Sequence, residues 1–244
     1  MTYCVAIRLE AGLVLASDSL TSAGVDDLSL YSKMHHFGTR SDRAIVLLSA
    51  GNLATTQAVI KQLERDMASA VAERSLDTLE HLDEIARYIG DVSGQIQQGF
   101  SSQAEQHSGM MEASFILAGQ IRGERHDAYL IYPQGNYIAT SREKPFLQIG
   151  ETKYGKPILD RIIDASVSLD RAARCALISM DASVRSNLTV GPPIELMQYE
   201  ADTQAIARRC RFDADDPWLK GLSKAWSDGL KRLFLELPRF DWEE

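Results

Sequence analysis

Short apolar runs alternate along the chain with longer segments in which apolar residues recur every three to four positions. The runs predict strands and the periodic segments predict helices, because side chains repeat every 2 residues in a strand and every 3.6 in a helix. Strands are expected at 3–9, 12–18, 34–38, 43–49, 113–122, 126–132, 136–140, 193–199 and 204–212. Helices are expected at 52–74, 78–100, 154–166, 169–184 and 215–237.

Turn residues separate these segments at several points. The tripeptide Glu10-Ala11-Gly12 between the first two strands predicts a hairpin, since glycine supplies the permissive turn backbone. The strand expected at 43–49 has a continuous apolar run at 44–48, which suits burial on both faces. It ends at Ala50-Gly51, and Asn52 is a good N-cap for the helix that follows.

The order of elements defines the fold class. Groups of strands alternate with pairs of helices, which indicates an α+β fold in which antiparallel sheets are covered by helices. Two packed sheets between two helix layers, a four-layer αββα sandwich, fit this order. We find no repeat, low-complexity tract or linker, so residues 1–244 are expected to form one domain.

Composition excludes several classes of function. The chain has 244 residues, 45% of them hydrophobic, and a formal net charge of −8 with scattered basic residues, so neither nucleic acid nor a membrane surface is expected as a partner. No apolar stretch is long enough to span a bilayer. Cys4, Cys175 and Cys210 are too widely spaced for a disulfide framework or a metal knuckle. We therefore expect a cytoplasmic protein without metal or cofactor.

The second residue carries the candidate chemistry. A threonine hydroxyl is a weak nucleophile, and the free α-amino group of the same residue can activate it as a base. Thr2 is small enough for Met1 to be trimmed by a methionine aminopeptidase, which would expose that amine. A free α-amine ordinarily has a pKa of about 7.7–8.0, which suits a general base near neutral pH, and a neighbouring cation would lower it further. Alone, a Met-Thr start says almost nothing.

Three more residues support the prediction that Thr2 is a nucleophile. Asp18 ends the second strand, Lys33 follows it and is the candidate cation, and Gly51 stands at a strand-to-helix turn where its N–H could stabilise an oxyanion. Singly, these would be a turn aspartate, a solvated lysine and a glycine chosen for its backbone freedom. In order behind Thr2, they resemble the reactive centre of proteasomal β-subunits.

Four longer segments make the resemblance closer. Ala16-Ser17-Asp18-Ser19, the run 48–57 (LSAGNLATTQ), the run 149–161 (IGETKYGKPILDR) and the run 186–191 (SNLTVG) are similar to the bacterial ancestral β-subunit family, Anbu. The resemblance covers essentially the whole chain. It implies a proteasome-like N-terminal nucleophile (Ntn) hydrolase, a threonine protease with the αββα sandwich. It also implies a large homo-oligomer without distinct α-subunits, a ring or lock-washer spiral of dodecamer size or more.

The resemblance implies further site residues. Proteasomal β-subunits place a serine after a glycine in the second half, whereas here Gly150 is followed by Glu151, and Thr152 could supply a hydroxyl one residue later. Asp181 and Ser186 match a later Asp–Ser pair by order, with Ser183 as a competing candidate.

The substrate and the activity are left open between alternatives. Ser49 occupies the base of the first side-chain pocket by the same resemblance, which predicts neutral groups there. The expected substrate is a peptide or a small amide. The alternatives are a catalytically silent scaffold subunit and a specialised amidase or peptide transferase. Silent α-subunits carry a helical extension ahead of the first strand, whereas this sequence starts at that strand, which favours an enzyme.

Overall fold

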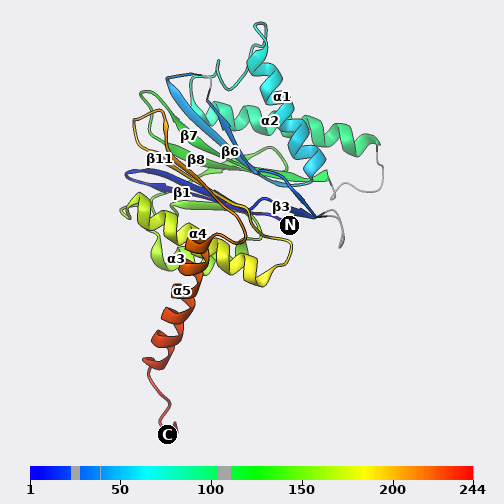
Figure 1. The fold of residues 1–244 in the computed structure, drawn as a ribbon. Helices are drawn as coiled ribbons and strands as arrows, with labels where there is room; N and C mark the ends of the chain where they lie inside the picture. The colour runs from blue at the N-terminus through cyan, green and yellow to red at the C-terminus, as the bar shows by residue number, and fades with distance from the viewer. Residues whose placement is uncertain (23–27, 39, 104–110, 244) are drawn as a thin grey trace.

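The chain folds into two antiparallel sheets packed face to face, with a helix pair outside each sheet (Figure 1). The structure is a computed structural model that describes residues 1–22, 28–38, 40–103 and 111–243. The layers run from α1 and α2, through the two sheets, to α3 and α4. The predicted four-layer α+β sandwich is confirmed.

The first sheet has the strand order β10-β1-β2-β11-β12, and every neighbouring pair is antiparallel. Its strands are β10 (Phe146–Gly150), β1 (Tyr3–Leu9), β2 (Gly12–Ser17), β11 (Ile194–Glu200) and β12 (Ile206–Phe212). Strand β1 lies between β2 and β10, so the start of the chain is held on both sides.

The second sheet has the order β5-β6-β7-β8-β9 and is also antiparallel. Its strands are β5 (Met34–Phe37), β6 (Arg43–Gly51), β7 (Ala113–Ile121), β8 (Asp127–Ile131) and β9 (Tyr137–Ala139). Strand β6 is buried along nearly its whole length, as its continuous apolar run predicts, because helices cover one face and the other sheet covers the other.

Five helices and a short hairpin complete the described fold. The helices are α1 (Leu53–Ala68), α2 (Leu82–Gln103), α3 (Thr152–Ile162), α4 (Leu169–Ser186) and α5 (Pro217–Leu235). Asn52 caps α1 as predicted, its side chain accepting a hydrogen bond from the Thr55 N–H at 3.1 Å. The hairpin joins β3 (Leu20–Ser22) to β4 (Leu28–Leu30).

Three apolar clusters fill the spaces between the layers. One lies between the first sheet and α3 and α4, one between the sheets, and one between the second sheet and α1 and α2. Side chains alternate along the strands, so β1 sends Tyr3, Val5 and Ile7 toward α4 and sends Cys4 and Ala6 toward the second sheet. The site described below lies where the ends of these strands meet.

The described structure contains three strands that the hydrophobic pattern does not predict. These are β3 and β4, of three residues each, and β10, of five. Strand β10 pairs with β1 across more than a hundred residues, so its stability comes from a distant partner rather than from local preference. Helix α2 begins at Leu82 rather than at 78, because the Ser75 hydroxyl accepts hydrogen bonds from the backbone N–H groups of Asp77 and Thr78, each at 3.2 Å, in a separate turn.

Helix α5 departs from the layered body. Leu219 and Leu222, near its start, pack against the cluster beside α4, but none of its residues is buried. The rest of the helix projects away from the molecule (Figure 1). None of the helices in the described residues is long and apolar enough to cross a membrane.

Candidate active site

Thr2 lies directly ahead of β1, between the end of β2 and the end of β10. Its carbonyl oxygen accepts a hydrogen bond from the Glu151 N–H at 2.7 Å. Tyr3 is paired with Gly150, and Cys4 with Ser17. The main chain at Thr2 is therefore fixed by sheet-like pairing, and half-buried Thr2 is a positioned residue rather than a loose chain end.

Gly150 makes the close approach to Thr2 possible. Its φ of +82° lies in the left-handed region, and a Cβ there would stand 1.9 Å from the Thr2 carbonyl oxygen. Any side chain would push β10 away from the start of β1, because the obstructing atom is backbone and cannot swing aside. Gly150 thus defines one wall around Thr2.

A buried ion pair lies beside Thr2. Lys33 Nζ is 2.7 Å from Asp18 Oδ1, with Asp18 fully buried and Lys33 6% exposed. The same oxygen accepts the N–H of Tyr3 at 3.0 Å, and Oδ2 accepts the N–H of Gly191 at 3.3 Å. The sequence predicted Asp18 and Lys33 as partners of Thr2, and the structure brings both to the start of β1.

Lys33 is aimed at the junction of Met1 and Thr2. Its ammonium donates to the Leu20 carbonyl at 2.7 Å and to the Met1 carbonyl at 3.5 Å. The Met1 carbonyl carbon is bonded to the Thr2 nitrogen, so the ammonium stands close to the atom that becomes the α-amine when Met1 is removed.

The charged groups beside Thr2 shift the pKa of an α-amine at the start of the chain. The pKa of the Met1 α-amino group is lowered from its ordinary value by partial burial and by Lys33, while Asp18 and Glu151 act in the opposite direction. Burial raises the pKa of the Asp18 carboxyl, and the Lys33 ammonium and the Tyr3 and Gly191 N–H groups oppose that rise. In the chain, the Thr2 nitrogen lies between the Met1 carbonyl, which Lys33 contacts, and the Tyr3 N–H, which Asp18 contacts.

The end of β6 reaches the same region. The Ser49 N–H donates to the Lys33 carbonyl at 3.0 Å, and Gly51 follows two residues later at the exposed strand end. Gly51 has a φ of +115°, and a Cβ there would stand 2.3 Å from the Glu112 carbonyl oxygen. Only glycine fits this turn, and its N–H is adjacent to the start of α1, whose dipole favours negative charge.

Ser49 is buried on β6. Alternation along the strand places it on the same side as Leu47, which belongs to the cluster covered by α1 and α2. Its backbone carbonyl accepts a weak hydrogen bond from the Cys4 thiol, with Sγ at 3.7 Å. Burial raises the pKa of that thiol, so Cys4 stays protonated and is a packing residue rather than a reagent.

Glu151, which the sequence marks only as a departure from the family pattern, also lies beside Thr2. It is 8% exposed, and its Oε2 has no hydrogen-bond partner among the described residues, although Lys153 Nζ is 3.5 Å away. Its charge acts to raise the pKa of the Met1 α-amine, against the effect of Lys33. The sequence feature that could have pointed to Glu151 is an acidic residue directly after Gly150. Thr152, the other candidate, begins α3 and is half-buried.

Asp181 and Ser186 lie on α4, and none of the contacts described above involves their side chains. Asp181 pairs with Arg185 Nε at 2.9 Å, and Ser186 is exposed at the last residue of the helix. The competing Ser183 is buried and its hydroxyl donates to the Ser179 carbonyl at 3.2 Å. No hydrogen bond between these three side chains and Thr2 occurs in the described part of the chain, so their roles stay predictions.

Helix α4 nevertheless supports the start of β1 through another serine. The Ser179 hydroxyl is 2.6 Å from the Tyr3 hydroxyl, which also accepts a hydrogen bond from Gln148 Nε2 at 2.6 Å. Among the described residues, no group of three or more His, Cys, Asp or Glu side chains is placed to hold a metal ion. The arrangement holds a threonine hydroxyl, a buried cation and an N–H donor, and removal of Met1 would add a free α-amine; these are groups that acyl transfer can use.

Solved structures of other proteins decide the family. A structure of Anbu (ancestral β-subunit) from Yersinia bercovieri is 40% identical, with 98% of this chain and 99% of that chain covered at a TM-score of 0.91. A Gly-1 mutant of Anbu from Hyphomicrobium sp. strain MC1 is 42% identical, with coverage of 99% and 100% and a TM-score of 0.91. The chain belongs to the Anbu family.

A third structure, the helical assembly of the Anbu complex from Pseudomonas aeruginosa, is 38% identical, with 98% of both chains covered and a TM-score of 0.92. No protein-family profile matches this chain, and no curated protein does. The Anbu resemblance predicted from four sequence segments is confirmed, and the likeness extends over the whole sandwich, including the strands that form the walls around Thr2.

Proposed function

We propose that this protein is an N-terminal threonine hydrolase that cleaves peptide or amide bonds, with Thr2 as nucleophile after removal of Met1. The observation that carries the proposal is the buried Lys33–Asp18 pair, which points an ammonium at the Met1–Thr2 junction. Membership of a proteasome-related family agrees with it. A buried ion pair is costly to maintain, and a catalytic role explains its position at a chain end.

In the proposed reaction, the Thr2 hydroxyl oxygen attacks the substrate carbonyl carbon while the Thr2 α-amine accepts the hydroxyl proton. The tetrahedral intermediate collapses to an ester on Thr2, and the amine gives its proton to the departing amine product. A water molecule then attacks the ester carbonyl carbon while the amine accepts a proton from the water. The ester bond breaks, the amine returns the proton to the Thr2 oxygen, and the acid product leaves. Partial burial and the charge of Lys33 lower the pKa of the Met1 α-amine, and the same two effects would favour the unprotonated, basic form of a Thr2 amine.

The negative charge that develops on the substrate oxygen needs a donor. Gly51 N–H, at the turn that leads into α1, is proposed for this role together with the helix dipole. Glu151 is proposed to accept a hydrogen bond from the free Thr2 amine, because its buried Oε2 is 3.5 Å from Lys153 Nζ but has no hydrogen-bond partner among the described residues. The two carboxylates and the lysine would then fix the direction of the amine.

We further propose that the chain acts as a large homo-oligomer. One structurally similar protein is a helical assembly, and α5 of this chain exposes apolar side chains that its own body does not cover. A repeated contact between identical chains closes into a ring or climbs into a spiral, depending on the rotation per copy. Threonines on an inner wall would meet only small or unfolded substrates.

Fluorogenic peptides that differ only at the residue before the scissile bond test the proposed activity. We expect neutral residues to be cleaved with a kcat/KM about tenfold or more above that of acidic or basic ones, because buried Ser49 offers no charge to pair with them. Fastest cleavage after a charged residue would contradict the role given to Ser49. No turnover of any peptide by assembled protein lacking Met1 would instead favour a silent scaffold.

A further inference from the structure

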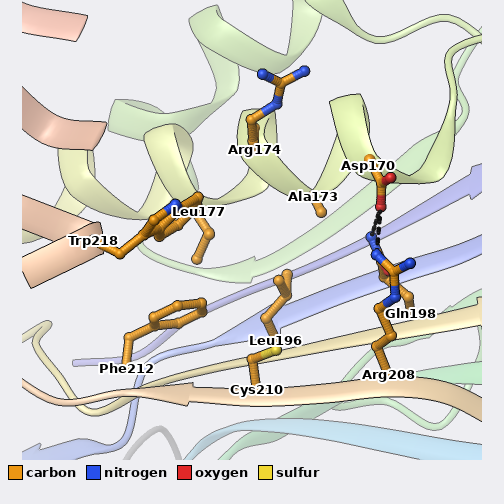
Figure 2. Close-up of a pocket in the computed structure, with 10 residues that line it drawn as sticks. All are labelled: Asp170, Ala173, Arg174, Leu177, Leu196, Gln198, Arg208, Cys210, Phe212 and Trp218. Carbon is orange, nitrogen blue, oxygen red and sulfur yellow. Dashed lines mark hydrogen bonds and ion pairs between the residues drawn. The ribbon is translucent and has the colours of Figure 1, made fainter. Parts of the chain in front are cut away.

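A cavity of about 350 Å³ opens between α4 and the strands β11 and β12, on the side of the molecule where α5 begins. Leu177, Leu196 and Phe212 contribute apolar walls, and Trp218, the second residue of α5, stacks on Phe212 with ring centroids 5.5 Å apart. Figure 2 shows these rings at one end of the cavity and the Asp170–Arg208 pair at the other. Strand β12 is the edge of its sheet, which leaves this side open.

The segment that follows α5 carries exposed aromatic side chains that suit an apolar cavity. Phe240 and Trp242 stack on each other at 4.6 Å, yet they are 63% and 77% exposed. Removing such large apolar side chains from water is favourable, so this exposed aromatic pair is a strong anchor for a partner surface. Indole and phenyl rings are also the side chains that most often anchor protein interfaces.

The charges of the segment after α5 and of the cavity rim are opposite in sign. In the sequence, the residues around the aromatic pair include four acidic side chains, Glu236, Asp241, Glu243 and Glu244, against one basic side chain, Arg239. Around the cavity, Arg174 and Arg208 line the rim, and Arg208 is already paired with Asp170 at 3.0 Å. Arg174 is exposed and makes no ion pair with any described residue, and Figure 2 shows its guanidinium at the outer rim, directed away from the strands.

A chain cannot fill its own cavity with this segment. The cavity adjoins the start of α5, whereas residues 240–242 follow its end, and 19 helical residues separate the two by about 28 Å. Figure 1 shows α5 carrying this end of the chain away from α4. An identical chain has no such restriction, because two antiparallel α5 helices place the end of each beside the start of the other.

We propose that the cavity between α4 and β11–β12 is the docking site for residues 240–242 of a second copy of this chain. The proposal rests on the homo-oligomeric assembly proposed above and specifies one of its contacts. The aromatic pair enters between Leu177, Leu196 and Trp218, and Arg174 meets the carboxylates that flank it. The apolar residues exposed along the second half of α5, Leu230, Leu233 and Phe234, face the partner helix.

A disulfide test uses a cysteine that the cavity already holds. Cys210 is exposed and lines the cavity, while Cys4 and Cys175 are buried and do not compete. The variant Asp241→Cys keeps both aromatic rings and, on oxidation with diamide, is expected to form a disulfide with Cys210 of a second copy, since linked Cα atoms lie within about 7 Å. Two controls should give no such product. These are Asp241→Cys combined with Cys210→Ser, and Val71→Cys, which alters an exposed apolar residue on another part of the surface.

Light scattering of the untreated protein and peptide mapping of the oxidised protein separate the outcomes. An oligomer in which positions 241 and 210 of different chains are linked supports the proposal. An oligomer linked through two 241 positions, or not linked at all, overturns it and leaves the assembly standing. A link between 241 and 210 inside one chain also overturns it. A monomer at micromolar concentration refutes the assembly and the docking contact together.

Discussion

Replacing Thr2 by alanine is expected to abolish hydrolysis, lowering kcat by about 10³-fold or more to the background rate. The variant lacks the hydroxyl that forms the ester intermediate, and no other described group occupies the same place: the nearby Cys4 thiol is buried and stays protonated. The measurement is turnover of the best fluorogenic peptide by the wild type and the variant at equal concentration of assembled protein.

Two features make this comparison selective. Alanine is as small as threonine at the second position, so Met1 should still be removed and the loss cannot be assigned to a blocked chain end. Thr2→Ser keeps the hydroxyl and loses only the methyl group that restricts χ1, so it should retain part of the activity. Wild-type turnover by Thr2→Ala would refute Thr2 as the nucleophile.

Replacing Lys33 by alanine is expected to lower kcat by about 10²-fold or more and to move the pH profile upward. Lys33 lowers the pKa of an amine at the start of the chain, so without it the Thr2 amine keeps its proton to higher pH and activity appears later as pH rises. The variant also leaves the Asp18 carboxylate buried without its partner, which costs about 3–5 kcal/mol of stability.

A matched lysine separates these effects from the loss of any surface charge. Lys156 is exposed on α3 and pairs with Asp160 one turn away, a contact worth at most about 1 kcal/mol, so Lys156→Ala should change neither activity nor its pH profile. The double variant Asp18→Asn/Lys33→Met removes both charges and should recover stability without recovering activity. An unchanged pH profile in folded Lys33→Ala would contradict the electrostatic role of Lys33.

Most of the sandwich could be predicted from the sequence because its elements carry strong local patterns. The run 43–49 is apolar at nearly every position and becomes β6, buried on both faces, and Asn52 caps α1 as its residue type predicts. Strands β3, β4 and β10 could not be predicted, since they are short and depend on pairing. The periodicity of α5 predicts an apolar stripe but does not show what covers it. The projection of this helix from the body therefore could not be predicted.

The candidate site was predictable where residue type and chain order specify the chemistry. Asp18 and Lys33 meet at the start of β1, as expected from their order behind Thr2, and Gly51 stands at the predicted turn. Glu151 could not be assigned from order alone, because its proposed role follows from the pairing of β10 with β1, which brings the Glu151 N–H against the Thr2 carbonyl. Asp181 and Ser186 match the family by order, but their helix directs Asp181 to Arg185.

Intact mass with and without an epoxyketone inhibitor shows whether Thr2 becomes a reactive chain end. Such an inhibitor forms its stable ring with a hydroxyl and a free amine of one residue. We expect a mass that lacks Met1 and gains one inhibitor per chain, with no gain in Thr2→Ala. Retained Met1, or an acetylated Thr2, in a sample that still hydrolyses peptides would contradict the proposed mechanism.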